Sequence, residues 1–63
     1  MNIQSALTEG LNILKNKSIL SAKLDSEILM AKALGKKREY IILNNNKIIK
    51  EQNLKYFKKL VHE

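Results

Sequence analysis

Residues 22–35 read AKLDSEILMAKALG, and this stretch carries the clearest helix signal in the chain. Its apolar residues recur at steps of three and four, which aligns them on one face of a helix. That stripe consists of Leu24, Ile28, Ala31 and Leu34, with Leu29 and Ala33 at its margins. Ser21 can cap the start, and Gly35 is placed as a left-handed C-cap. We therefore predict a helix from about Ser21 to Leu34, with this stripe in the core.

Three other segments show helical periodicity. The first runs from about Ile3 to Lys15, the second from about Lys37 to Leu43 and the third from about Lys50 to His62. Their apolar residues are Ile3, Ala6, Leu7, Leu11 and Leu14, then Tyr40, Ile41 and Leu43, and finally Leu54, Phe57, Leu60 and Val61. The run 40–43 alone resembles a strand, but it would have no partner strand. The pattern predicts an all-α fold, a small antiparallel bundle of about four short helices.

Local signals mark several ends and contacts of these helices. Asn2 is a suitable N-cap for the first helix. Gly10 lies inside that helix and costs about 1 kcal/mol against Ala, so we expect another helix to approach it closely. Asn44, Asn45 and Asn46 favour a turn. The last helix has a poor cap, because Ile49 stands where Ser, Thr or Asp is preferred.

Length and composition exclude several classes of protein. The 63 residues form one domain at most, and without Cys no disulfide or thiolate site is possible. His62 is the only His, so a structural zinc site is excluded. Residues 1–14 lack the pattern of a secretory signal, and no stretch approaches the roughly 18 apolar residues of a membrane span. We expect a soluble, cytoplasmic protein.

The sequence offers no catalytic constellation. Its two Gly residues cannot build a phosphate-binding loop. Four Ser residues are present, but the only candidate base is His62 near the chain end. Asp25 and Glu27 lie two positions apart and would point about 200° away from each other on a helix, so they cannot act as an acid–base pair. We expect no catalytic, cofactor-binding or metal-binding residue in this chain.

The net charge of +6 leaves two interpretations open. A basic surface can attract nucleic acid or an acidic protein, but Lys, Ile and Asn are also abundant together in AT-rich coding sequences. Arg occurs once, and the three aromatic side chains are too few for a base-stacking platform, which disfavours nucleic acid. Lys36, Lys37 and Arg38 lie between two predicted helices. They are either solvated charge or a possible partner contact, and we predict that they matter more for binding than for folding.

The stretch 22–35 also resembles the N-terminal helical domain of the HemK/PrmC family, the release factor glutamine methyltransferases. Leu24-Asp25-x-Glu27 followed by Leu34-Gly35 is the most specific part of the match. Lys37 to Leu43 looks like the family's short basic-aromatic helix. Glu51-Gln52 with Phe57 and Leu60 is similar to its last helix. Two departures are Lys23, where Arg is usual, and Ile49, where a capping Ser or Thr is common.

This resemblance implies a function that the chain could serve only in part. The family methylates the glutamine of the Gly-Gly-Gln loop in class I translation release factors. Its S-adenosylmethionine loop and its Asn-Pro-Pro-Tyr motif lie downstream, and this chain has no Pro. Residues 1–63 would then be the N-terminal substrate-recognition domain of a longer methyltransferase. They would contact the release factor and the catalytic domain that binds S-adenosylmethionine. The alternatives are an independent basic module binding RNA or DNA, and a structural protein-interaction bundle.

Overall fold

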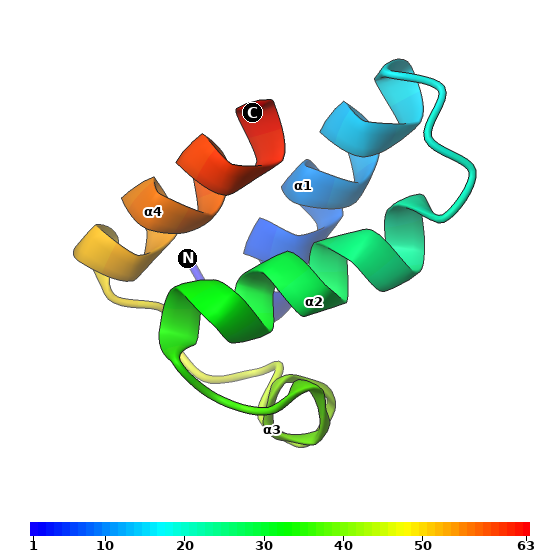
Figure 1. The fold of residues 1–63 in the computed structure, drawn as a ribbon. Helices are drawn as coiled ribbons and strands as arrows, with labels where there is room; N and C mark the ends of the chain where they lie inside the picture. Colours follow the sequence, from blue (N-terminus) through cyan, green and yellow to red (C-terminus); the bar gives the residue numbers. More distant parts are fainter.

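The computed structural model describes all residues, 1–63, as four helices without a sheet (Figure 1). The helices are α1 (Ile3–Asn16), α2 (Ala22–Leu34), α3 (Arg38–Leu43) and α4 (Glu51–His62). Every observed boundary lies within one residue of the predicted one, and the strand-like run 40–43 is helical. The all-α prediction is confirmed. None of the helices has the length and apolarity that crossing a bilayer requires.

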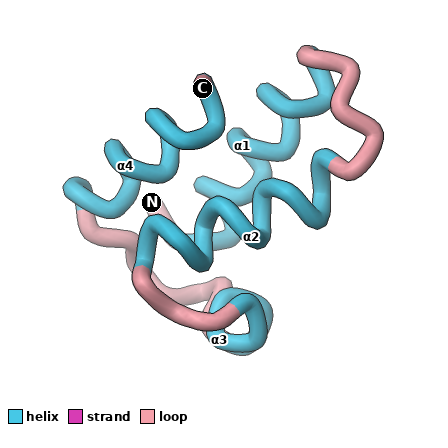
Figure 2. Tube along the Cα trace, viewed as in Figure 1, coloured by secondary structure: helices cyan, strands magenta, loops and turns pink.

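Helix α2 is the centre of the packing. It contacts α1, α3 and α4, and α1 also contacts α4. Figure 1 shows α2 running opposite to both α1 and α4, while α1 and α4 run in the same direction and α3 is seen nearly end-on. Figure 2 shows that the connections lie at the margins of this packed group. The antiparallel packing predicted from the sequence therefore holds for α2 against its two long neighbours.

The buried face of α2 differs from the predicted one. Leu24 and Ile28 are 43% and 49% exposed, so their assignment to the core was wrong. The helix instead buries Ala22, Ser26, Met30, Ala31 and Ala33. Apolar residues lie on two sides of α2, and the side with small residues lets α1 and α4 approach closely. The side with larger residues stays half exposed.

The remaining core follows the predicted stripes more closely. Its buried apolar residues outside α2 are Ile3, Ala6, Leu14, Ile41, Ile49, Phe57 and Val61. Leu7, Leu11, Leu54 and Leu60 are partly buried against this cluster, as is Tyr40. Leu43, one of the apolar residues of the predicted helical pattern, is 79% exposed and lies outside the core. Tyr56 is 42% exposed, although it directly precedes the buried Phe57.

The helix ends show which local signals are used. The Asn2 side chain accepts a hydrogen bond from the Ser5 amide at 2.7 Å, as expected of an N-cap. Ser21 occupies the N-cap position of α2, but its hydroxyl donates to Asp25 and makes no capping bond. Gly35 has a φ of +65°, which confirms the left-handed C-cap. Lys50, one residue after the predicted Ile49, is the N-cap residue of α4, and it makes no side-chain capping bond, in agreement with the predicted poor cap.

The N-terminus forms backbone hydrogen bonds with the connection between α3 and α4. The amides of Ile3 and Gln4 donate to the carbonyls of Lys47 and Asn45 at 2.9 Å and 2.8 Å. The Ile49 amide donates to the Met1 carbonyl at 3.0 Å. The bonded residues lie in and directly after the predicted turn of residues 44–46. They hold a segment that would otherwise be a loose loop against the start of α1.

Candidate interaction surfaces

The predicted contact residues Lys36, Lys37 and Arg38 do not form one cluster. Lys36 and Lys37 lie in the connection between α2 and α3, and Lys37 is the N-cap residue of α3. Arg38, the first residue of α3, turns back toward α2, where its Nε donates to Glu27 Oε1 at 2.9 Å. Its side chain is 46% exposed and that of Glu27 is 17% exposed. The Arg38 charge is therefore compensated within the domain.

The aromatic ring of Tyr40 makes cation–π contacts with a different pair of cations. The Lys36 ammonium lies 5.3 Å from the centroid of its ring, and the Lys47 ammonium lies 5.7 Å from it. Such cation–π contacts contribute about 0.5–1 kcal/mol at exposed sites and restrict where the ammonium groups lie. Lys47 was not predicted to join the site. No spacing in the sequence indicates it, because it reaches Tyr40 only through the turn at residues 44–46.

A hollow of about 270 Å³ lies next to Tyr40, and we call it the basic pocket. Its lining consists of Ile3, Leu34, Lys36, Tyr40, Ile48, Ile49, Lys50 and Asn53. Ile3 and Ile49 belong to the buried core, so the floor is apolar. Ile48 is 76% exposed. Lys36 and Lys50 are both exposed and contribute cationic groups to the lining. The basic pocket thus combines apolar contact area with positive charge.

The lysines around the basic pocket have no acidic partner. The structure contains three ion pairs, which are Arg38–Glu27, Lys55–Glu51 and Lys58–Glu9. None of them involves Lys36, Lys47 or Lys50, and none involves Lys37. These lysines are therefore not compensated by ion pairs within the domain. Such a site attracts anionic groups.

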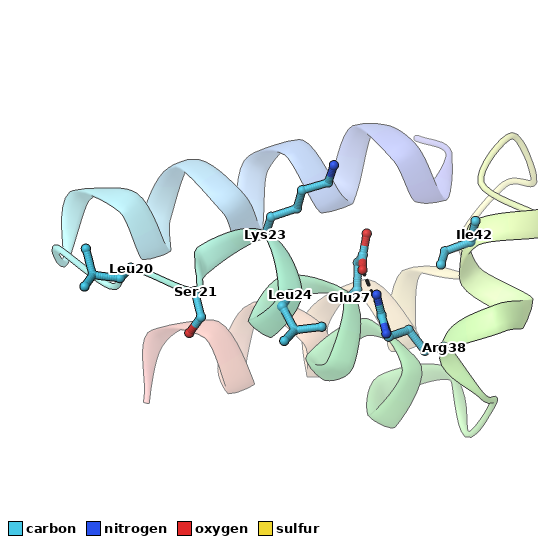
Figure 3. A pocket seen from close by; sticks show the side chains of 7 residues that line it. All are labelled: Leu20, Ser21, Lys23, Leu24, Glu27, Arg38 and Ile42. Carbon is cyan, nitrogen blue, oxygen red and sulfur yellow. Dashed lines mark hydrogen bonds and ion pairs between the residues drawn. The ribbon is translucent and has the colours of Figure 1, made fainter.

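A second surface is an apolar groove between α2 and α3, which we call the α2–α3 groove. It is an open depression of about 620 Å³, lined by Leu20, Ser21, Lys23, Leu24, Glu27, Arg38 and Ile42. Figure 3 shows the Glu27–Arg38 pair between Leu24 and Ile42, with Leu20 at the far end. Leu20 is fully exposed. It follows Ser18, whose φ of +62° is unusual for a residue other than Gly. The sequence pattern predicted Leu24 to be a core residue and gave no indication of this groove.

The polar side chains of α2 form hydrogen bonds within the domain. Asp25 accepts a hydrogen bond from Ser21, while Glu27 accepts one from Arg38, so the two carboxylates have separate partners. No three His, Asp or Glu side chains come together in a metal-binding group. The buried Ser26 hydroxyl donates to the Lys23 carbonyl at 2.9 Å. What the surface offers to a ligand is positive charge at the basic pocket and apolar area in both hollows.

Comparison with known proteins gives a consistent match along the chain. The family model described as the PrmC N-terminal domain matches residues 5–63. A release factor glutamine methyltransferase from Clostridium botulinum (strain Hall) is 40% identical to this chain over 58 residues. That alignment covers 90% of this chain and 20% of the relative, so the chain spans about one fifth of the relative's length. No solved structure gives a significant match.

Proposed function

Because the chain belongs to the family of PrmC N-terminal domains, we propose that it is the substrate-recognition domain of a release factor glutamine methyltransferase. Its role would be to bind a class I translation release factor and to hold it beside a catalytic domain of the same protein. The observation that carries this proposal is the family match over residues 5–63. The name of the relative from Clostridium botulinum supplies the substrate class.

The chemistry of the whole enzyme would be methyl transfer from S-adenosylmethionine to the glutamine amide of the Gly-Gly-Gln loop. The residues of this chain do not fit that cofactor. Its four elements are all helices, and its two glycines lie inside α1 and at the end of α2 rather than in one phosphate- or nucleoside-binding loop. Cofactor binding and catalysis would therefore belong to the remaining four fifths of a protein such as the relative. Because translation termination takes place in the cytoplasm, the proposed function would place this domain there.

The surface supports a binding role. The α2–α3 groove exposes Leu20, Leu24 and Ile42, and large apolar side chains gathered on a surface often mark a protein contact. The Glu27–Arg38 pair crosses this groove and gives it a polar centre. A second, cationic surface lies at the basic pocket. Both surfaces are accessible in this structure.

A titration tests the proposal directly. A class I release factor is added to the 63-residue chain, and binding is followed by isothermal titration calorimetry at about 0.15 M salt. Parallel titrations use a DNA duplex and a single-stranded RNA of the same molar concentration. Saturable binding of the release factor, stronger than binding of either nucleic acid, is the expected result. Steeply salt-dependent binding of nucleic acid without a response to the release factor would overturn the proposal and favour a basic nucleic-acid module.

A further inference from the structure

We infer that the basic pocket is the docking site for an acidic segment of the release factor, a stretch with carboxylates next to one apolar side chain. This inference rests on the proposed function, since it names the feature of the release factor that this end of the domain recognises. The apolar side chain would enter the pocket over Ile3 and Ile49. The carboxylates would lie against Lys36, Lys47 and Lys50.

Charge complementarity is the first argument. Lys36 and Lys47 both lie over the ring of Tyr40, at 5.3 Å and 5.7 Å, and Lys50 lines the adjoining pocket. No carboxylate of the domain pairs with any of the three, although Glu27, Glu51 and Glu9 each pair with a cation elsewhere. Cations held near one another without counter-charges repel, and an anionic partner relieves that repulsion. The ligand at this surface is therefore acidic.

The size of the pocket is the second argument. Its volume of about 270 Å³ lies below the ~300–1,000 Å³ that small-molecule sites usually have. A single large side chain is a suitable occupant for a hollow of this size with an apolar floor. The exposed Ile48 adds contact area to the lining. An acidic segment that also carries an apolar residue uses both properties of the pocket, whereas a simple anion would use only its charge.

The third argument is that the pocket is already formed. Ile48 and Ile49 lie in the connection between α3 and α4, where main-chain segments are normally mobile. Here backbone hydrogen bonds from Ile3 to Lys47 and from Ile49 to Met1 fix this connection to the N-terminus. The cation–π contacts with Tyr40 restrict the amines of Lys36 and Lys47 as well. A partner would therefore bind without ordering the segment, which lowers the entropy cost of association.

Nucleic acid fits this surface less well than an acidic protein segment. A single-stranded base needs an accessible aromatic face to stack on, and the Tyr40 ring is already in contact with two lysine ammonium groups. The apolar floor of the pocket also has no counterpart in a phosphate backbone.

The test compares two triple variants of equal charge. The site variant carries Lys36→Gln, Lys47→Gln and Lys50→Gln. The control variant carries Lys15→Gln, Lys32→Gln and Lys59→Gln, three exposed lysines that line none of the hollows. Release factor is titrated into each protein at two salt concentrations, and folding of both variants is checked by circular dichroism.

We expect the site variant to raise the Kd about tenfold and to reduce its salt dependence, and the control variant to change the Kd less than about threefold. A matched pair of apolar substitutions tests whether the apolar part of the pocket contributes to binding in addition to its charge. Ile48→Ser should weaken binding, whereas Leu43→Ser, which is equally exposed but lies outside the pocket, should not.

Each other outcome has a distinct meaning. If the unmodified chain binds release factor but both triple variants lose affinity equally, the docking site is wrong while the proposed function stands. If the unmodified chain does not bind release factor, the proposed function fails and this inference fails with it. Tighter binding of single-stranded RNA, lost in the site variant alone, would assign the surface to RNA and overturn the acidic-segment inference.

Discussion

Gly10 sets the distance between α1 and α4. A Cβ atom at this position would lie 2.5 Å from Phe57 Cζ and 2.9 Å from Cε2. Phe57 is 1% exposed, so its ring has little room to move away. Overpacking typically costs about 1–3 kcal/mol, and the gain in helix propensity from Gly to Ala is about 1 kcal/mol. We expect Gly10→Ala to lower the free energy of unfolding by up to about 2 kcal/mol, measured by urea denaturation.

A control in the same helix isolates the steric effect. Asn12 is exposed on α1, so Asn12→Ala gains helix propensity without a clash and should be neutral or slightly stabilising. If Gly10→Ala were as stable as the original protein, α4 would not approach α1 as closely as the Gly10–Phe57 contact requires.

Gly35 is needed for a different reason. Nothing lies within 4 Å of a Cβ atom built there, but the backbone has a φ of +65°. An L-residue in this region is strained by about 1–2 kcal/mol, and Asn tolerates it better than other residues. We expect Gly35→Ala to reduce the free energy of unfolding by about 1 kcal/mol and Gly35→Asn to reduce it less. Equal losses for the two variants would point to a cause other than backbone strain.

In helix α2, the residues that stabilise the fold and the residues that form the surface lie on different faces. Met30 is fully buried, whereas Leu24 and Ile28 are nearly half exposed. Removal of a buried Met side chain costs about 2–5 kcal/mol through lost burial and a residual cavity. We expect Met30→Ala to cost that amount in thermal or urea unfolding, and Leu24→Ala and Ile28→Ala to cost about 1 kcal/mol or less each. A larger loss for Leu24→Ala than for Met30→Ala would reverse the assignment of the buried face.

The same helix shows what the sequence could and could not predict. Its C-terminal end was predicted correctly because it depends on local chemistry, the left-handed conformation of Gly35, whereas Ser21 occupies the N-cap position without making the predicted capping bond. Its orientation depends on packing. Apolar residues occur on both sides of α2, so periodicity favoured the larger Leu24 and Ile28. The fold buries the side with Ala22 and Ala33 instead, because three neighbouring helices pack around this one.

At the scale of the whole molecule, the sequence predicted only some of the residues that form the basic surface. Lys36 and Lys37 were identified because they are adjacent in sequence, but adjacency also grouped them with Arg38, which pairs with Glu27 eleven positions earlier. Lys47 joins Lys36 only because the chain reverses at residues 44–46 and the N-terminus holds the following segment. A sequence pattern records which charges are present. The fold determines which of them are compensated and which remain available to a partner.

We therefore predict that release factor binding and the stability of the fold depend on different lysines. Lys15, Lys32 and Lys59 lie in the last turns of α1, α2 and α4, where each cation stabilises its helix by about 0.3–1 kcal/mol. Replacing all three with Gln should therefore cost about 1–3 kcal/mol in total, and 1 kcal/mol shifts the Tm of a domain this small by about 4–8 °C.

The three lysines at the basic pocket and the Tyr40 ring should behave in the opposite way. Gln at Lys36, Lys47 and Lys50 removes two exposed cation–π contacts, each contributing about 0.5–1 kcal/mol, but it also relieves repulsion among uncompensated charges. These effects oppose each other, so the Tm should stay close to that of the original protein, measured by circular dichroism, while release factor binding weakens. If affinity instead followed the Tm in both triple variants, the lysines would act through folding, and the basic pocket would have no separate role in recognition.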